Sequence, residues 1–433
     1  HMIHDLKSEP YYQIMVSNYQ KILSQFGFIE NEIKDQQYIV QFITADLNTI
    51  KKHATIYISE SLERLRIKRP AVASVKVTVQ SGILKTHIEQ TDLDEKTLAE
   101  VLKAYRAGKK YIRLNDEVIL TDTQEVKALS EFVMHHDLNI NNLHATYSHP
   151  MYHLFKFEQM SQYLTIEIEE KLKQIMVNLR SYQTKQLTHL PHTYDLLKPY
   201  QKDGFKWLLT LYEENLGGIL ADDMGLGKTL QVISLIEVIQ TDKPILVACP
   251  KSLVYNWSNE LIKFEATFPH IIYAGSKEVR EDLFEEIKNS STKTLVITSY
   301  DTLRNDIEHL RTYTFDTVIL DEAQHIKTIT AQKTQAVKEI MADHRFVLTG
   351  TPLENAISDL WSIFDFLMPG YLYHYAKFKR IETKATDSDT EMLNFIVAKT
   401  KPFILRRTKK QVLKELPDKV EELRYTDFIK RIY

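Results

Sequence analysis

The chain has 433 residues, of which 43% are hydrophobic and 26% are charged, and its formal net charge is −3. This composition is typical of a globular protein of two or three domains and excludes a largely disordered chain. A single cysteine, Cys249, excludes intrachain disulfides and a cysteine-based zinc site, and it favours a reducing cytoplasm. No apolar run reaches the roughly 18 residues that span a bilayer, so we expect no membrane partner.

The first part of the chain, up to about residue 190, predicts an α+β domain. Segments 38–43 and 75–79 alternate apolar with polar residues, which is typical of half-exposed antiparallel strands. Helical periodicity covers four stretches, namely 11–26, 94–106, 123–137 and 166–182. We find no chemical motif in this part of the chain.

Beyond residue 190 the expected strands become short, continuous apolar runs, which are typical of a parallel sheet covered by helices on both faces. These runs are 218–221, 245–248, 295–297, 318–320 and 346–348. Helical patterns lie between them at 228–240, 253–264, 330–341 and 355–367. The alternation predicts an α/β fold with a doubly wound sheet over residues 190–420, and its ligands should lie at the carboxyl ends of the strands.

A glycine-containing loop follows the first of these runs and opens a helix. Such a loop directs backbone N–H groups at one point, where the helix dipole also favours an anion. Within it Lys228 can neutralise the β- and γ-phosphates of ATP, and the Thr229 hydroxyl can bind Mg²⁺. The predicted nucleotide-binding residues of the loop are Met224, Gly225, Leu226, Gly227, Lys228 and Thr229. A chance glycine turn is the alternative, and the strand–loop–helix context argues against it.

An acidic pair ends the strand near residue 320. Asp321 at the strand tip can hold Mg²⁺, and Glu322 can orient and deprotonate an attacking water. The alternative is a solvated acidic pair where a strand leaves the core. The preceding lysine loop favours the catalytic interpretation, with Lys228 and Glu322 as catalytic residues.

Seven segments in order over residues 196–418 make the chain similar to the Swi/Snf-type ATPases of helicase superfamily two. They are Leu197–Leu208, Asp222–Thr229, Val247–Trp257, Ile297–Arg304, Asp321–Gln324, Leu348–Asn355 and Pro402–Lys409. The resemblance implies a RecA-like lobe that hydrolyses ATP when stimulated by double-stranded DNA and translocates along the duplex. It also implies that Gln201 recognises adenine.

The same resemblance implies which residues contact DNA and which couple the two activities. The implied DNA-binding residues are Lys251, Ser252, Ser299, Tyr300, Arg406, Arg407 and Lys409, and the implied coupling residues are Thr349, Gly350 and Thr351. A solvated basic helix face is the alternative for the cluster near residue 406. The tryptophans Trp207, Trp257 and Trp361 fall in helical apolar patterns, so we expect them to pack in the core.

Two features depart from the family pattern. Gln324, the third predicted catalytic residue, stands where most members have a histidine. Because an amide both donates and accepts hydrogen bonds, we expect altered coupling rather than lost catalysis. After residue 419 we expect no room for a second RecA-like lobe, which needs on the order of 150 residues. We therefore expect this chain alone to hydrolyse ATP weakly or not at all.

The hypothesis from sequence is thus a DNA-dependent ATPase that remodels or displaces protein–DNA complexes in the cytoplasm, at the nucleoid. The alternative is a nucleotide- and DNA-binding scaffold with reduced catalysis. An RNA helicase of the same superfamily is disfavoured, because the segments at 197–201 and 405–409 resemble the duplex-DNA branch. Segment 104–114 resembles part of a bacterial accessory domain, so residues 3–185 either regulate the lobe, guide DNA or only stabilise it.

Overall fold

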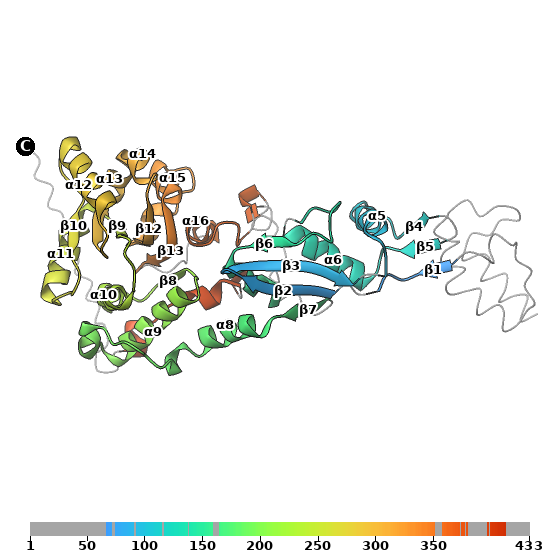
Figure 1. Ribbon diagram of the computed structural model, residues 1–433, viewed down its shortest axis with the longest axis horizontal. Helices are drawn as coiled ribbons and strands as arrows, with labels where there is room; N and C mark the ends of the chain where they lie inside the picture. The colour runs from blue at the N-terminus through green and yellow to red at the C-terminus, as the bar shows by residue number, and fades with distance from the viewer. Residues whose placement is uncertain are drawn as a thin grey trace, which may run out of the picture. The chain divides into compact units, whose positions relative to one another are not determined.

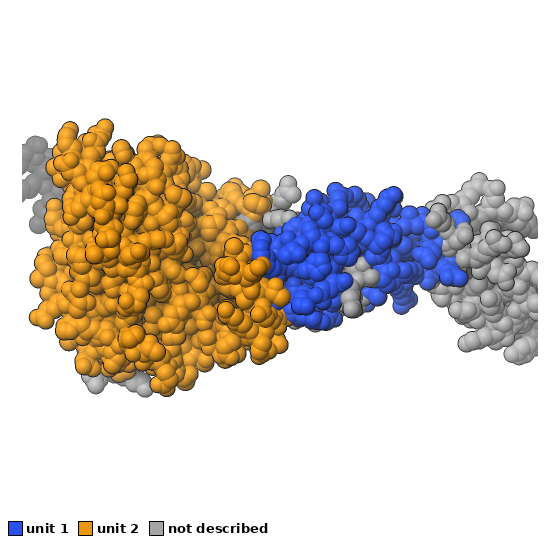
Figure 2. All heavy atoms as spheres, viewed as in Figure 1, with its two compact units in different colours: residues 1–77, 85–148, 158–167 blue, residues 78–84, 149–157, 168–433 orange. Residues whose placement is uncertain are grey.

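A computed structural model gives the fold of the chain (Figure 1). The structure describes residues 66–71, 74–90, 92–114, 117–136, 138–158, 164–350, 357–372, 374–376, 378–379, 396–397 and 399–412. The chain divides into two compact units, one of residues 1–77, 85–148 and 158–167 and one of residues 78–84, 149–157 and 168–433 (Figure 2). Within the described ranges, no helix is both long enough and apolar enough to cross a membrane.

The smaller unit contains a mixed sheet and two amphipathic helices. The sheet order is β1 (Arg66–Lys68), β5 (Glu117–Leu120) and β4 (Tyr111–Leu114). Strand β5 pairs antiparallel with β4 and parallel with β1, so this sheet is mixed. Helices α5 (Glu95–Arg106) and α6 (Gln124–His135) begin after Asp94 and Thr123, whose side chains accept hydrogen bonds from the backbone three residues on.

A four-stranded sheet has the order β6 (Tyr147–His149), β3 (Ile83–Gln90), β2 (Ser74–Gln80) and β7 (Thr165–Ile168). Burial alternates at the start of β2, which confirms the predicted strand at 75–79. The helices predicted at 94–106 and 123–137 are confirmed by α5 and α6. The helix predicted at 166–182 begins later, because residues 165–168 form β7. The helix predicted at 11–26 and the strand predicted at 38–43 lie outside the described residues.

The larger unit has a RecA-like seven-stranded sheet in which every pair of neighbours is parallel. Its order is β10 (His270–Ile272), β11 (Leu295–Ser299), β9 (Ile245–Cys249), β12 (Thr314–Leu320), β13 (Met341–Leu348), β8 (Gly218–Leu220) and β14 (Ile404–Leu405). Strands β8, β9 and β11 are buried throughout, as expected for strands covered on both faces. This sheet confirms the predicted α/β fold.

Helices precede, connect and follow these strands. They are α7 (Leu154–Glu158), α8 (Glu170–Arg180), α9 (Pro199–Glu213), α10 (Lys228–Val238), α11 (Val254–Lys263), α12 (Lys277–Asn289), α13 (Tyr300–Asn305), α14 (Ile307–Leu310), α15 (Gln332–Glu339), α16 (Ile357–Leu367) and α19 (Lys409–Val412). Helices α10, α11, α15 and α16 confirm the four predicted helices of this part within a few residues at each end. The predicted core positions of Trp207, Trp257 and Trp361 are also confirmed, because these side chains are 2%, 1% and 7% exposed.

The sequence missed the outer parts of this sheet. Strands β12 and β13 begin earlier than predicted, because polar or exposed residues interrupt the apolar pattern ahead of the predicted runs. The two strands nevertheless pair in register from Thr314 opposite Met341. The edge strands β10 and β14 have three and two residues, too few for a periodic pattern. Only pairing with β11 and β8 defines them as strands.

The sheet and α9 pack tightly against each other at Gly218, the first residue of β8. A Cβ atom there would lie 2.8 Å from Cη2 of Trp207 and closer still to Leu211. We predict that Gly218→Ala lowers the free energy of unfolding by about 1–3 kcal/mol, because overpacking forces both side chains out of their rotamers. Urea unfolding of the larger unit measures this, with exposed Lys288→Ala as the control, and equal stability of the two variants would contradict the prediction.

Candidate nucleotide and magnesium site

The predicted catalytic and binding residues follow the carboxyl ends of three neighbouring strands in the sheet. Strand β13 lies between β8 and β12, with Leu348 opposite Leu220 and Val347 opposite Leu320. Three segments therefore lie together at the carboxyl end of the sheet. They are the loop after β8, the acidic pair after β12 and residues 349–350 after β13. Parallel register alone brings these three segments together, although they are far apart in sequence.

The phosphate loop is shaped by two glycines with left-handed backbone. Gly225 has a φ of 83° and Gly227 a φ of 74°, a region that disfavours residues with a Cβ. A Cβ at Gly227 would also collide with Nε2 of Gln201. Gly227 caps α10, which begins at Lys228, so the helix dipole points at the loop. Met224 is exposed and Thr229 is half-buried.

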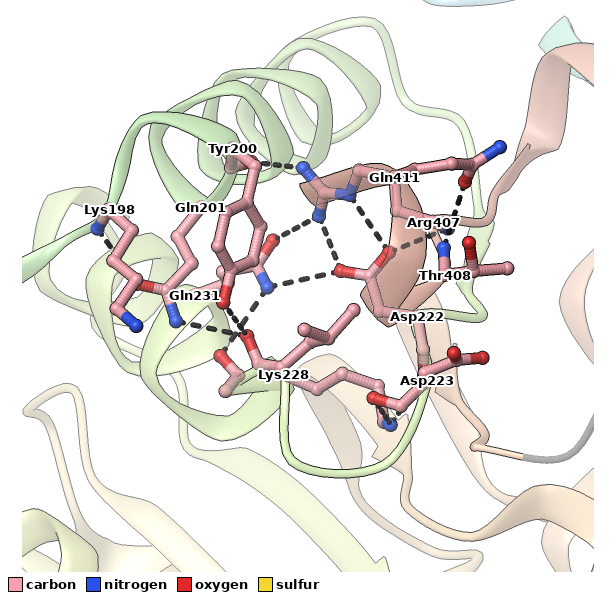
Figure 3. A network of polar contacts seen from close by, with 12 residues as sticks. Lys198, Tyr200, Gln201, Asp222, Asp223, Lys228, Gln231, Arg407, Thr408 and Gln411 are labelled. Atoms are coloured by element: carbon pink, nitrogen blue, oxygen red, sulfur yellow. Dashed lines mark hydrogen bonds and ion pairs between the residues drawn. The ribbon is translucent and has the colours of Figure 1, made fainter. Parts of the chain in front are cut away.

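Lys228 faces the acidic pair. Its Nζ donates to the backbone oxygens of Asp222 at 2.7 Å and Asp223 at 3.4 Å (Figure 3). Burial lowers the pKa of Lys228, and the nearby carboxylates of Glu322 and Asp321 oppose this shift by favouring the charged ammonium. A Cβ at Gly350 would lie 3.4 Å from the same Nζ. The structure thus brings together Lys228, Asp321, Glu322 and Gly350.

Asp321 is buried, and residues from two other strand ends hold it. The indole Nε1 of Trp257, on α11, donates to its Oδ2 at 2.9 Å, and the backbone N–H of Glu322 donates to its Oδ1 at 2.9 Å. The hydroxyl of Tyr300, at the start of α13, donates to its backbone oxygen at 2.8 Å. Burial raises the pKa of Asp321 to about 6, although the hydrogen bond from Trp257 opposes the rise.

Glu322 and Gln324 form a short polar chain to the end of β13. Glu322 adopts left-handed backbone, with φ 51° and ψ 57°, a strained conformation for a residue with a side chain. Gln324 Nε2 donates to Glu322 Oε2 at 2.9 Å, and Gln324 Oε1 accepts from the Thr349 hydroxyl at 3.4 Å. The amide therefore connects the acidic pair to Thr349 through both of its polar ends.

Gln201, expected to contact adenine, is 6% exposed and is used within the protein. Its Oε1 accepts from the Lys198 N–H at 2.8 Å, and its Nε2 donates to the Leu226 carbonyl at 3.0 Å. These bonds fix the start of α9 against the phosphate loop. Contact with adenine stays a prediction.

Three of the predicted DNA-contacting residues have side chains that are largely buried and bonded within the protein. Ser299 and Tyr300 are 4% and 2% exposed, and their side chains bond to Thr302 and Asp321 within the protein. The Arg407 side chain is 13% exposed and forms an ion pair with Asp222. Contact of these three residues with DNA stays a prediction, and their buried side chains offer it little surface.

The other predicted DNA contacts fit the expectation of accessibility. Lys251, Ser252, Arg406 and Lys409 are exposed, the first two in the 3₁₀ turn Lys251–Leu253 that follows β9. Their contact with DNA stays a prediction. Thr351, a predicted coupling residue, lies outside the described residues.

Sequence reasoning missed two functional contacts in the site. It assigned Trp257 to core packing alone, although a buried indole N–H needs an acceptor, and that requirement could have indicated a partner. It also placed Arg407 on the surface, because a run of basic residues does not reveal which one meets Asp222. Both contacts join segments that are far apart in the chain.

The bond from Trp257 to Asp321 gives a testable pH dependence in the absence of Mg²⁺. Because burial raises the pKa of Asp321 from 3.8 to about 6, its contribution to stability is complete below about pH 4 and is lost as the pH rises through about 6. Trp257→Phe removes a donor that favours the charged form. We predict that it raises the pKa of Asp321 further and moves this loss of stability to higher pH.

Carboxyl-carbon NMR titration of Asp321 measures the shift, and unfolding free energies across the same pH range give the second readout. Trp207→Phe, a change in another buried tryptophan, is the matched control and should leave the titration of Asp321 unchanged. An unchanged pKa in Trp257→Phe would contradict the prediction.

Comparison with protein families matches residues 200–431 to the SNF2-related domain. Residues 3–189 match the domain described as bacterial SNF2 helicase associated. These two matches divide the chain close to residue 190, where the sequence pattern also changes.

Several curated relatives share these regions. An uncharacterized ATP-dependent helicase of Mycoplasma genitalium is 32% identical over 95% of this chain and 40% of its own length. The TATA-binding protein-associated factor MOT1 of Saccharomyces cerevisiae is 36% identical over 55% of this chain and 14% of its own length. The chain thus spans well under half the length of these relatives.

Among solved structures, the Sulfolobus solfataricus SWI2/SNF2 ATPase core in complex with dsDNA is similar at 37% identity, with a TM-score of 0.47. This match covers 51% of the present chain and 47% of the other. The domain matches and the curated relatives confirm the resemblance inferred from the motifs. The chain therefore belongs to the SNF2 family, with an SNF2-related domain that follows a bacterial SNF2 helicase-associated domain.

Proposed function

We propose that this chain is the MgATP-binding lobe of a DNA-dependent ATPase that translocates on double-stranded DNA and remodels or displaces bound proteins. The observation that carries the proposal is the juxtaposition of the Lys228 ammonium with the carboxylates of Asp321 and Glu322 at one edge of the sheet. A cation for phosphate and two acids for metal and water are the groups that phosphoryl transfer to water requires.

Different residues of the site bind the triphosphate, hold the metal ion and activate the water. Amides of the phosphate loop and Lys228 bind the triphosphate, and Lys228 exchanges its present backbone acceptors for phosphate oxygens. The Thr229 hydroxyl and Asp321 carboxylate are oxygen donors of the kind that Mg²⁺ prefers, and they would hold it. When bound, this ion neutralises charge on the phosphates. Glu322 orients the attacking water and accepts its proton.

Gln324 supports coupling between the site and β13. Its amide bonds to Glu322 at one end and Thr349 at the other, as a histidine at this position would be expected to do. A change in the position of the β13 end would therefore move the Glu322 carboxylate. This connection favours an active ATPase over a scaffold with reduced catalysis.

DNA contact is supported by exposed residues next to segments that contact Asp321 or the phosphate loop. Lys251 and Ser252 precede α11, which carries Trp257, and Arg406 and Lys409 belong to the basic segment after β14. Lysine and arginine side chains here would bind phosphates without reading sequence. Force on the segment after β9 would reach the carboxylate of Asp321 through Trp257.

Substitutions in the site separate nucleotide binding from hydrolysis. We predict that Lys228→Ala weakens MgATP binding by roughly tenfold or more, because a charge-assisted bond to phosphate is lost. Glu322→Gln should keep the affinity and slow hydrolysis by roughly 10²-fold or more, as expected when a general base is removed.

Titration with a fluorescent ATP analogue measures binding, and single-turnover hydrolysis with duplex DNA and excess protein measures even a slow step. Exposed Glu285→Gln is the matched control for Glu322→Gln. Equal rates in the parent chain and Glu322→Gln would contradict the proposed role. Hydrolysis at a rate that depends on Glu322 would argue against the scaffold.

The DNA surface gives a separate prediction. Lys251→Ala should weaken duplex binding about equally for unrelated sequences and reduce the slope of log affinity against log salt by about one. Fluorescence anisotropy at several salt concentrations measures both quantities. Exposed Lys288→Ala, on α12, is the control, and an unchanged slope in Lys251→Ala would remove Lys251 from the DNA surface. Competition with structured RNA tests the preference for duplex DNA.

A further inference from the structure

The segment after β14 runs alongside the phosphate loop and is bonded to it by its backbone. Strand β14 pairs with β8, and the Ala221 N–H donates to the Leu405 carbonyl at 2.7 Å. One step further, the Asp223 N–H donates to the Arg407 carbonyl at 3.0 Å. The Lys409 N–H then donates to the Asp223 carboxylate at 2.9 Å. Residues 221–223, which open the loop, therefore lie against residues 405–409.

Asp222 provides the charged centre of this contact. Its side chain is completely buried, and its Oδ1 accepts from the backbone N–H of Arg407 at 3.1 Å and from Nε at 2.9 Å. The Arg407 guanidinium also donates to Oδ2, as does Gln231 Nε2 at 3.3 Å (Figure 3). A buried carboxylate requires such pairing, and the planar fork of arginine meets both oxygens at once, which lysine cannot do.

Arg407 also reaches the far end of the loop through two intermediaries. Its guanidinium donates to the Tyr200 carbonyl and, at 2.9 Å, to Gln231 Oε1. The Tyr200 hydroxyl donates to the Leu226 carbonyl at 3.1 Å, and Gln231 Nε2 donates to the Gly227 carbonyl at 3.4 Å. The Arg407 guanidinium thus connects Asp222, at the start of the loop, with Leu226 and Gly227 at its end.

Two further observations tie this network to the nucleotide site. A Cβ at Gly204 would lie 2.6 Å from the Arg407 guanidinium and closer still to Gln231, so glycine on α9 makes room for the network. The backbone oxygen of Asp222 accepts the hydrogen bond from Lys228. Arg407 therefore holds the residue against which the phosphate-binding lysine rests.

From these contacts we propose that Arg407 is a positioning residue for MgATP, which holds both ends of the phosphate loop through Asp222, Tyr200 and Gln231, and that it is not a DNA contact. The inference rests on the proposed nucleotide-binding function and adds a residue outside the loop to it. Residues 405–409 thereby become part of the nucleotide site, because a shift of this segment displaces Asp222 and Asp223.

The test compares Arg407→Gln, Arg407→Lys and the double variant Arg407→Gln/Asp222→Asn with the parent 433-residue chain. The double variant removes the buried charge that Arg407→Gln leaves unpaired, so it stays folded if the single variant does not. The matched control is Arg311→Gln. Arg311 also pairs with two carboxylates, Glu308 and Glu339, but it precedes β12 and so lies at the amino end of the strands, away from the nucleotide site. Each variant is titrated with a fluorescent ATP analogue in Mg²⁺ and with duplex DNA at several salt concentrations, and its Tm is measured.

We expect the MgATP Kd to rise about tenfold or more in Arg407→Gln and in the double variant, and less in Arg407→Lys, with the DNA Kd and its salt slope unchanged. Arg311→Gln should change neither. A lowered Tm with an unchanged MgATP Kd would show a purely structural role and overturn the proposal. A weaker DNA Kd with a reduced salt slope and unchanged MgATP Kd would restore Arg407 to the DNA surface. A parent chain that binds no MgATP would overturn the proposed function itself, and this inference with it.

Discussion

The arrangement depends on one constraint, the placing of β13 between β8 and β12 in a parallel sheet. Parallel strands have their carboxyl ends on the same side of the sheet. This strand order therefore places Lys228 of one loop next to Asp321 and Glu322 of another. Burial would make the Lys228 ammonium costly, and the carboxylates of Asp321 and Glu322 oppose that cost. Charge pairing and strand order thus support the same geometry.

Asp321 connects this edge to the next two strands. Trp257 follows β9 and Tyr300 follows β11, and each donates one hydrogen bond to Asp321. These residues lie in the two segments that resemble DNA-contacting motifs, and their large side chains point inward while Lys251 and Ser252 are exposed. Each of these two short segments therefore carries an inward aromatic residue that contacts Asp321, and the segment after β9 also carries outward polar residues.

On the other side of the site, β14 forms the edge of the seven-stranded sheet and is the last strand among the described residues. A strand of two residues such as β14 has little pairing of its own, and the Arg407–Asp222 pair with its surrounding bonds adds to it. The strained backbone of Glu322 fits the same picture, because a left-handed glutamate persists where its neighbours determine its position. Here these neighbours include Gln324 and the buried carboxylate of Asp321.

The sequence by itself determined the class of fold, most strand and helix positions of the second half, and the candidate groups for phosphate and metal. Apolar runs, a glycine loop and an acidic strand end are local signals, since each results from neighbouring residues and the period of one element. It did not determine the short edge strands β10 and β14, which only pairing defines, nor the roles of Trp257, Tyr300 and Arg407. Whether a buried indole or a basic side chain meets an acid depends on residues 64 and 185 positions away, as for Trp257 with Asp321 and Arg407 with Asp222. Only the tertiary structure decided these pairs, because the order of the strands sets which loops meet at the carboxyl end of the sheet. Distance along the sequence does not.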